Sequence, residues 1–458
     1  MRLRRRLVRN LVFPAIEAAQ RRPTLEMLRE ADRTQWWSHD ALLGLQVREL
    51  DRLLTHCWNH NRFHRERLEA AGLEPGRLRA VEDLARLPLL TKDDLRAAGA
   101  AIRSTAPPLG AVKKATSGST GDAFTFEYNA ESRHWRDVTR IRAYEWAGCP
   151  VGARSLHYWG QRVVTSTWKQ RWKSTIDHAI RREHYVDSMA RGDDDLARAV
   201  DTIRHVAPDV IVTFPQSGAD LARFIVRKGI GRDWGRIPVI CGGERVFAPD
   251  RAVLDEVFGP VFETYGGRET MLIGAECEAH DGLHVAMENI IAEIVVRLPD
   301  GRVRPAAPGE AGEVVVTDLH NFFMPFIRYL NGDRAVQREV ERCSCGRSLH
   351  RIGPVDGRVA ETLRDGRGNR VGGLVFEFLF REMIDVARQI QVVQARDTSV
   401  ILKLVLNEKG TELSPPKQAI VQSVFDRYLP GVSFRIQIVD DIPLTAGGKR
   451  HLVKSEMV

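Results

Sequence analysis

The sequence predicts an α/β protein with a large N-terminal domain of packed β-sheets and helices and a small C-terminal α+β domain. Three observations support this prediction. The first hundred residues are mostly helical in pattern, the middle of the chain alternates short apolar runs with helical segments, and the composition changes again near Gly357. Such alternation is typical of buried sheets covered by helices. The predicted parts are residues 1–100, 101–356 and 357–458.

The helical character of the N-terminal part comes from leucine spacing and capping signals. The stretch "HDALLGLQVRELDRLLTHCWNHNRFHRERLEAAG" carries leucines at helical intervals. In "LTKDDLRAAG", Thr91 is an N-cap residue with Asp94 three positions later, and a glycine ends the segment. We therefore expect a helix to begin directly after Thr91.

The middle part contains the predicted sheet strands. The apolar runs are "DVIVTF", "IPVICGG", "AEIVVRL" and "GEVVVTDL", and helical segments such as "GADLARFIVRKG" alternate with the earlier of them. Runs this short, rich in β-branched residues, predict buried strands.

The C-terminal hundred residues show the pattern of a compact α+β unit. "ETLRDGRGNRVGG" predicts a hairpin, "FEFLFREM" a helix, "ILKLVLN" a strand, "PPKQAIVQSVFDRYL" a helix and "SFRIQIVDDIPL" a strand. A unit of about 100 residues is large enough to be a domain of its own.

The bulk composition is that of an ordinary globular protein. The chain has 458 residues, of which 43% are hydrophobic and 28% charged. It has no long uncharged apolar run and no secretory signal pattern, so neither a membrane span nor export is expected. Six cysteines in a chain of this length do not indicate a disulfide scaffold. We therefore expect a cytoplasmic protein.

The positive charge is concentrated at the start of the chain. The formal net charge is +8, and Arg2, Arg4, Arg5, Arg6 and Arg9 lie within the first nine residues. With the apolar residues between them, these arginines predict either a basic amphipathic helix at an anionic membrane surface or a solvated basic terminus. The sequence contains no recognisable nucleic-acid-binding motif, so no nucleic-acid partner is expected.

A loop of small and hydroxyl residues, "KKATSGSTGDAF" at 113–124, raises the question of chemistry. Glycines and hydroxyl residues make a poor helix and a poor core strand. The loop is either an ordinary surface loop or a cradle of backbone N–H groups and hydroxyls for phosphate. It is not a Walker loop, because the G-x-x-x-x-G-K-[ST] pattern is absent.

Four further segments follow the loop in order. They are "CGGERV" at 241–246, "ETYGGRET" at 263–270, "FIRYLNGDRA" at 326–335 and "IPLTAGGKRHLVK" at 442–454. Glu269 is suited to a metal–phosphate, Asp333 to a ribose diol, and Lys449 stands directly after a Gly-Gly turn. Any one of these segments is common, but their joint occurrence in this order is specific.

These five segments together resemble the motifs of the adenylate-forming enzymes, which include acyl–CoA synthetases, peptide-synthetase adenylation domains and luciferases. "TSGSTG" is similar to the family's triphosphate loop, "YGGRET" to its Y-G-x-T-E segment, and "PLTAGGK" to its catalytic-lysine loop. "GGE", "FIRYLNGDRA" and "CSCGR" resemble the phenylacetate–CoA ligase branch. The N-terminal stretch from "QWWSHDALL" resembles CapK-type relatives, which are associated with capsular polysaccharide synthesis.

The resemblance implies a role for each matching residue. The loop would hold the phosphates of ATP, and Glu244 and Tyr265 would lie at the adenine. Gly243 and Gly266 would also belong to the nucleotide-binding site, and Asp333 would hold the ribose with Arg358 nearby. Glu269 would bind Mg²⁺, Thr270 would lie near the α-phosphate, and Lys449 would be the catalytic lysine. The loop residues meant are Ser117, Gly118, Ser119, Thr120 and Gly121.

Two positions depart from the family pattern. Many members have lysine after the last glycine of the loop, where this chain has Asp122. The usual G-R-x-D hinge between the domains reads Gly357-Arg358-Val359-Ala360, without the acid. The first departure bears on phosphate binding and the second on rotation of the small domain.

A separate set of residues predicts a structural zinc site. Cys277, His280 and His284 occur in "ECEAHDGLH", and Cys343 and Cys345 in "CSCGR". Thiolates and imidazoles are the preferred ligands of structural zinc. We predict Cys277, His284, Cys343 and Cys345 as the four ligands, with His280 as the alternative to His284. The competing interpretation is a set of unrelated core cysteines and surface histidines.

The predicted activity is ATP-dependent conversion of a small carboxylic acid to acyl-AMP, followed by transfer of the acyl group to CoA. Two alternatives stay open: an amide ligase that transfers the acyl group to an amine or amino sugar, and a degenerate nucleotide-binding scaffold protein in envelope-polysaccharide assembly. The sequence does not identify the acid. "SLHYWGQ" at 155–161 and "TFPQSGA" at 213–219 are candidates for the lining of its pocket.

Overall fold

A computed structural model of the chain describes residues 5, 7–106, 110–115, 125–159, 178–188, 192–358, 363–368, 370–371, 376, 379, 382–383, 386–408, 412–443 and 452–457. The chain divides into two compact units. Unit 1 comprises Met1–Ala153, Ile180–Arg182 and Phe262–Val355, and unit 2 comprises Arg154–Ala179, Glu183–Val261 and Asp356–Val458. The domain boundaries inferred from composition, after residues 100 and 356, stay predictions.

The N-terminal part of unit 1 is helical, as predicted. A short π-helical turn, η1 (Val8–Val12), leads into α2 (Phe13–Ala19), and the helices and 3₁₀ turns that follow are α3 (Thr24–Thr34), α4 (His39–His60), α5 (Arg62–Ala70), η2 (Val81–Arg86), α6 (Lys92–Ala98) and η3 (Gly99–Ile102).

Two local signals set the ends of these helices. The long leucine-rich stretch forms two helices, because Asn61 leaves the helical conformation and its side chain accepts a hydrogen bond from the His64 N–H, which caps α5. At α6 the structure confirms the predicted cap, since Thr91 and Asp94 form a reciprocal capping box.

The sheet of unit 1 is mainly antiparallel and carries the main core of this unit. Its strands lie in the order β11-β10-β12-β13-β14-β9-β8-β7. Their bounds are β7 (Val261–Gly267), β8 (Met271–Glu276), β9 (Leu283–Val285), β10 (Ile290–Arg297), β11 (Val303–Pro305), β12 (Ala311–Asp318), β13 (Tyr329–Gln337) and β14 (Arg351–Arg358). Phe126, Ile294, Val314 and Phe326 are among the buried side chains that pack on it.

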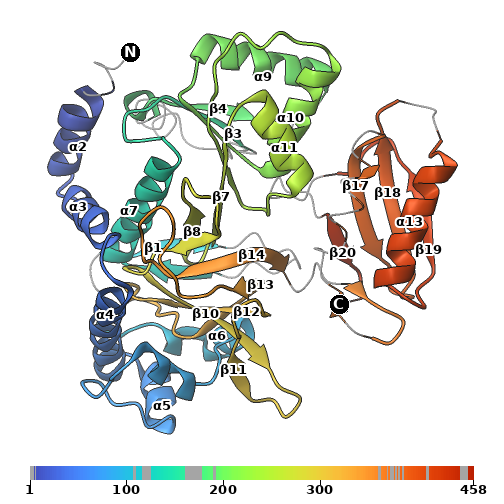
Figure 1. The fold of residues 1–458 in the computed structure, drawn as a ribbon. Helices are drawn as coiled ribbons and strands as arrows, with labels where there is room; N and C mark the ends of the chain where they lie inside the picture. Colours follow the sequence, from blue (N-terminus) through green and yellow to red (C-terminus); the bar gives the residue numbers. More distant parts are fainter. Residues whose placement is uncertain are drawn as a thin grey trace. The chain divides into compact units, whose positions relative to one another are not determined.

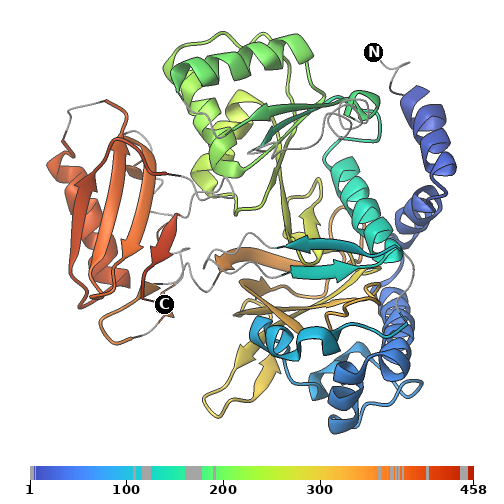
Figure 2. The ribbon, with the colours of Figure 1, turned by 180° about the vertical axis from the view of Figure 1, so that it is seen from behind.

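A two-stranded ribbon precedes the long helix of unit 1. Strands β1 (Val112–Ala115) and β2 (Thr125–Tyr128) pair in antiparallel fashion, and β2 leads directly into α7 (Ala130–Trp146), as the view from behind shows (Figure 2). The residues between the two strands, 116–124, lie outside the described part of the chain.

Unit 2 begins with a parallel sheet in the order β6-β5-β3-β4. The strands are β3 (Ser155–Trp159), β4 (Glu183–Asp187), β5 (Val210–Thr213) and β6 (Val239–Gly242) (Figure 1). Helix α9 (Asp193–Val206) lies between β4 and β5 in the chain, α10 (Pro215–Arg227) between β5 and β6, and α11 (Ala248–Val257) follows β6. Every residue of β5 and β6 is buried, as expected for parallel strands covered on both faces. The strands predicted from "DVIVTF" and "IPVICGG" are thereby confirmed.

The C-terminal part of unit 2 has a sheet and a core of its own. Its four-stranded sheet has the order β19-β18-β17-β20, with α13 (Pro415–Tyr428) lying along it (Figure 1). Leu402, Leu404, Val421 and Phe425 belong to the core between helix and sheet. The strands are β17 (Ala387–Gln394), β18 (Val400–Leu406), β19 (Phe434–Ile438) and β20 (Val453–Ser455), and β15 (Leu363–Arg364) pairs with β16 (Arg370–Val371) as the predicted hairpin. The helix predicted for "FEFLFREM" lies largely outside the described residues.

In the part of the chain that the structure describes, none of the helices combines the length and the apolar character needed to cross a bilayer.

Candidate functional site

The segment "YGGRET" forms the turn between β7 and β8 in unit 1. A Cβ atom on Gly266 would lie 1.8 Å from the main-chain oxygen of Met271, so only glycine fits there. The strand pairing shifts register between Tyr265 and Gly266, and Met271 has a φ of 59°. Such local strain persists only where the surrounding structure holds it. The turn thereby gives Glu269 and Thr270 defined places beside the sheet.

Tyr265 and Asp333, predicted for adenine and ribose, are in direct contact. The Tyr265 hydroxyl donates to Asp333 Oδ2 at 2.9 Å. Asn331 Nδ2 donates to the Tyr265 hydroxyl oxygen at 2.7 Å and to Asp333 Oδ2 at 3.2 Å, and its Oδ1 accepts from the Asp333 N–H at 3.0 Å. The structure therefore brings two motifs that lie far apart in the sequence into one hydrogen-bonded group.

Two cations surround Glu269. Arg136 Nη2 donates to the main-chain oxygen of Glu269 at 2.6 Å and to Asp318 Oδ2 at 2.9 Å, and the Arg136 side chain is only 4% exposed. Lys92 Nζ lies 3.0 Å from Glu269 Oε1. The side chain of Glu269 is 12% exposed and that of Lys92 is 31% exposed. The carboxylate predicted to bind Mg²⁺ is thus paired with a lysine ammonium, and its role toward Mg²⁺ stays a prediction.

The remaining residues predicted for ATP binding and catalysis either lie outside the described part of the chain or belong to unit 2. Ser117, Gly118, Ser119, Thr120, Gly121 and Lys449 lie outside the described residues. Gly243 and Glu244 follow β6 in unit 2, with a φ of 80° at Gly243, and Arg358 ends β14. Their assignments to phosphate, adenine and catalysis stay predictions.

Lys92, Arg136 and Asn331 are the polar residues of this group that sequence reasoning missed. Asn331 stands in the "NGD" motif itself, so its place beside Asp333 was a usable signal. The residues around Lys92 predict only a helix cap, and the pattern of the helix that carries Arg136 gives no sign of a buried arginine. Their contacts depend on pairings between distant segments, which no local pattern shows.

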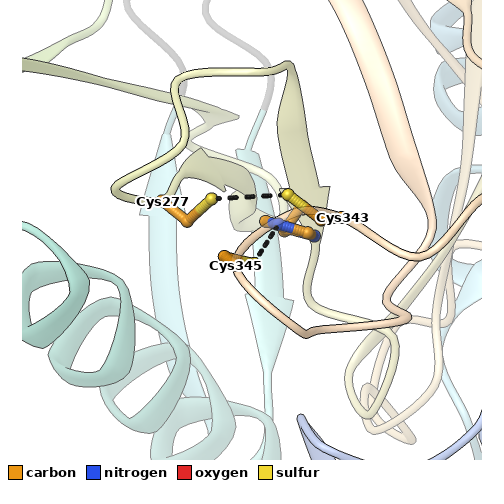
Figure 3. A group of neighbouring side chains, drawn as sticks. Cys277, Cys343 and Cys345 are labelled. Carbon is orange, nitrogen blue, oxygen red and sulfur yellow. Dashed lines mark hydrogen bonds between the residues drawn. The ribbon is translucent and has the colours of Figure 1, made fainter.

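A second group of residues in unit 1 has the arrangement of a metal site. The ligand atoms of Cys277, His284, Cys343 and Cys345 all lie within 4.8 Å of one another. Cys277 Sγ is 3.9 Å from Cys343 Sγ, and Cys345 Sγ is 3.4 Å from His284 Nε2 (Figure 3). Three sulfurs and one imidazole nitrogen form the donor set of a structural zinc site.

The elements of the sheet bring these four residues together. Cys277 follows β8, His284 lies in β9, and the pairing of β9 with β8 and β14 places the cysteine loop before β14 beside them. Gly346, with a φ of 90°, closes the turn by donating its N–H to the Cys343 carbonyl at 2.8 Å. His280 lies elsewhere, because its Nδ1 is 3.4 Å from Glu276 Oε2. The geometry therefore favours His284 over His280.

The burial of the cluster affects its protonation. Burial lowers the pKa of His284 to about 4, with the nearby charges of Arg347 and Arg351 acting in the same direction. Burial also raises the pKa of the Cys277 thiol to about 12. The imidazole is thus neutral and able to act as a ligand, whereas the thiol loses its proton readily only when a cation is present.

Comparison with known proteins gives concordant results. Residues 363–456 match the family model described as the CapK C-terminal domain. The chain is 26% identical over 365 residues to the phenylacetate–coenzyme A ligase of Thermus thermophilus, covering 78% of this chain and 79% of the relative. It is 28% identical over 353 residues to that of Pseudomonas putida, covering 74% and 76%.

The fold is also found among solved structures. A crystal structure of 2-hydroxyisobutyryl-CoA ligase, in the postadenylation state in complex with R3-HIB-AMP, matches with a TM-score of 0.72 at 19% identity, covering 93% of this chain and 92% of that one. This likeness confirms the predicted α/β fold with a large sheet-rich domain and a smaller C-terminal domain. The chain is therefore similar in sequence to phenylacetate–coenzyme A ligases and similar in fold to 2-hydroxyisobutyryl-CoA ligase, and its residues 363–456 match the CapK C-terminal domain.

Proposed function

We propose that the protein is an AMP-forming acid–thiol ligase, which converts a carboxylic acid and ATP to acyl-AMP and pyrophosphate and then transfers the acyl group to CoA. The observation that carries this proposal is the hydrogen-bonded group of Tyr265, Asn331 and Asp333, because Tyr265 lies in β7, the strand that leads into the turn carrying Glu269. The phenylacetate–CoA ligases among its relatives support the choice of CoA as the acceptor.

The reaction has two displacement steps. A carboxylate oxygen attacks the α-phosphorus, the bond to the β-phosphate oxygen breaks, and pyrophosphate leaves. The CoA sulfur then attacks the acyl carbon, its proton passes to solvent, and AMP leaves. Bound Mg²⁺ supplies positive charge for the phosphates. Catalysis is mainly positioning and charge stabilisation, which we assign to the N–H groups of the 117–121 loop, to Thr270 and to Lys449.

The test is a screen for pyrophosphate release over aryl, fatty and hydroxy acids, with and without CoA. We expect one class of acid to release pyrophosphate and to yield a hydroxamate when hydroxylamine traps the acyl-AMP. Consumption of CoA in the same reaction supports the ligase. Acyl transfer to an amine without loss of CoA supports the amide ligase, and the absence of any acyl-AMP supports the scaffold. A role in capsular polysaccharide synthesis stays a prediction.

We further propose that Cys277, His284, Cys343 and Cys345 hold a structural Zn²⁺. The support is the donor set itself, because three sulfurs and one nitrogen converge within 4.8 Å. Tetrahedral closure by four protein ligands leaves no position for substrate, so the metal has a folding role. Zinc binding would fix the turn 343–347 against β8 and β9.

The membrane contact proposed for the basic N-terminus gains one supporting observation. Leu7 and Leu11 are 51% and 62% exposed, whereas Val8 faces the backbone at Gly152. An outward pair of leucines beside arginines suits the surface of an anionic bilayer. Deleting residues 1–12 should reduce binding to anionic vesicles and leave acyl-AMP formation unchanged. Equal vesicle binding by both proteins contradicts the contact. The cytoplasmic location stays a prediction.

A further inference from the structure

Lys92 enters the candidate adenylation site from a distant part of the chain. The Leu90 N–H donates to the Arg328 carbonyl at 2.8 Å, and the Leu330 N–H donates to the Leu90 carbonyl at 2.8 Å. Leu90 therefore runs parallel to the start of β13, the strand that carries Asn331 and Asp333. Helix α6 begins immediately afterwards, and its capping box at Thr91 fixes the position of the Lys92 backbone.

The position of Lys92 is not explained by the stability of α6. The first turn of a helix favours negative side chains, because the N-terminal end of the helix dipole is positive, so a lysine there is electrostatically unfavourable. Asp93 and Asp94 occupy the same turn and suit the dipole, whereas Lys92 does not. Its ammonium is instead directed to Glu269, 3.0 Å away. Lys92 therefore does not stabilise α6, and its ammonium instead contacts Glu269 in the candidate site.

The Lys92 ammonium and a divalent cation would compete for the same carboxylate, that of Glu269. The Glu269 carboxylate is the predicted ligand of Mg²⁺, and a lysine ammonium at 3.0 Å competes with a divalent cation for the same oxygens. The segment 116–124 contains no lysine or arginine of its own and carries one acid, Asp122. Lys92 has a flexible four-carbon stem and a partly exposed head, which allow the ammonium to change partners.

We propose that Lys92 is the exchangeable counter-cation of the adenylation site. Its ammonium neutralises Glu269 while no divalent cation is bound. When the cation reaches Glu269 with ATP, the ammonium turns to the phosphate oxygens of the nucleotide. This inference rests on the proposed function, because it takes Glu269 as the metal ligand and ATP as the nucleotide.

The experiment measures two binding equilibria without turnover. Mn²⁺ binding to the nucleotide-free protein is followed by electron paramagnetic resonance, and ATP binding in excess EDTA is followed by calorimetry. In Lys92→Met we expect Mn²⁺ to bind about tenfold more tightly, because the competing ammonium is gone, and metal-free ATP to bind about tenfold more weakly. Lys92→Arg should keep both affinities within about threefold of the wild type, since it keeps the charge.

Lys228→Met is the matched control, because Lys228 also pairs with an acid, at 2.8 Å from Asp193 Oδ2, on the surface of unit 2. It should change neither affinity. The two opposite shifts in Lys92→Met cannot arise from misfolding, which weakens both equilibria. Loss of both affinities, a change in only one, or no change overturns the inference. The proposed function fails separately, if the wild type forms no acyl-AMP with any acid while the opposite shifts are still observed.

Discussion

At the scale of single residues, His64 is a buried imidazole held by two partners. Its Nε2 is 2.9 Å from the Pro325 carbonyl and its Nδ1 is 3.2 Å from Arg67 Nη1, and the side chain is 1% exposed. Burial, with the charge of Arg67, lowers the pKa of His64 to about 3. The imidazole therefore stays neutral in the folded protein over the pH range in which it titrates in the unfolded chain.

This neutral histidine predicts an acid-sensitive fold. Between the unfolded pKa of about 6.5 and the folded value, the unfolded chain binds one more proton, so the free energy of unfolding falls as the pH falls. At pH 5 the loss from this residue is about 2 kcal/mol. His64→Gln, whose amide can keep both hydrogen bonds, should lose about 2 kcal/mol less than the wild type between pH 7 and pH 5.

Urea unfolding at several pH values measures this difference. His205→Gln is the control, because His205 is exposed on α9. The prediction is wrong if His64→Gln and the wild type lose equal free energy of unfolding on acidification.

The limits of sequence reasoning at this scale are visible at Glu269. The motif "YGGRET" was enough to choose Glu269, Tyr265 and Gly266, because its glycines and its acid have a local meaning. Lys92 and Arg136 were not chosen, since their contacts with Glu269 arise only when α6 and α7 pack beside the sheet. Charged residues that act through tertiary contacts carry no local signature.

At the scale of elements, the β7–β8 turn gives a sharp stability test. In Gly266→Ala the new Cβ would lie 1.8 Å from the Met271 main-chain oxygen, so the backbone must move. We expect a loss of about 2 kcal/mol or more in the free energy of unfolding, with loss of acyl-AMP formation because Glu269 shifts. Gly267→Ala is the neighbouring control, since its nearest contact is the flexible end of Glu269 at 3.4 Å. Similar melting temperatures for the two variants would contradict the role assigned to Gly266.

The cysteine loop before β14 tests the metal proposal at the same scale. We expect about one zinc per chain after exhaustive dialysis, measured by mass spectrometry. Changing Cys343 and Cys345 to Ser should remove the metal and lower the melting temperature, because binding of structural zinc contributes to folding free energy. Cys149→Ser, outside the cluster, should retain the metal. The proposal is wrong if the wild-type protein contains no zinc and added zinc does not change its melting temperature.

The helices and strands could be predicted from the sequence better than the contacts between them. The runs that became β5, β6, β10 and β12 are short, apolar and β-branched, and the capping box of α6 is a four-residue signal. By contrast, the stretch that became α4 and α5 has continuous helical periodicity, and its break depends on the backbone conformation of Asn61. The convergence of the two cysteine motifs depends on the pairing of β9 with β14, which periodicity does not encode.

At the scale of the whole molecule, the order of the motifs was the most informative property of the sequence. Each segment alone has a common structural explanation, but a triphosphate-like loop, a Y-G-G-x-E-T turn, an N-G-D motif and a terminal Gly-Gly-Lys in this order indicate one reaction. The proposed reaction also needs residues of both units, because Glu269 and Asp333 belong to unit 1 whereas Lys449 belongs to unit 2. The last prediction concerns Lys449 and the half-reaction in which it acts.

Lys449 is predicted to act only in the first half-reaction. By resemblance to the family, its ammonium lies between the carboxylate and the α-phosphate during adenylation, and the small domain then carries it away for thioester formation. A preorganised cation at that point is worth several kcal/mol, so Lys449→Ala should slow acyl-AMP formation by about 10²-fold or more. Thioester formation from supplied acyl-AMP should persist, and Lys449→Arg should rescue poorly because its planar fork places the charge differently.

The two half-reactions, measured separately by pyrophosphate release and by thioester formation, decide between three outcomes. A normal rate of adenylation in Lys449→Ala removes the residue from the mechanism. Loss of adenylation alone supports alternation of the small domain, despite the absence of the usual acid after Arg358. Loss of both half-reactions means that Lys449 is needed in each, so the small domain does not alternate.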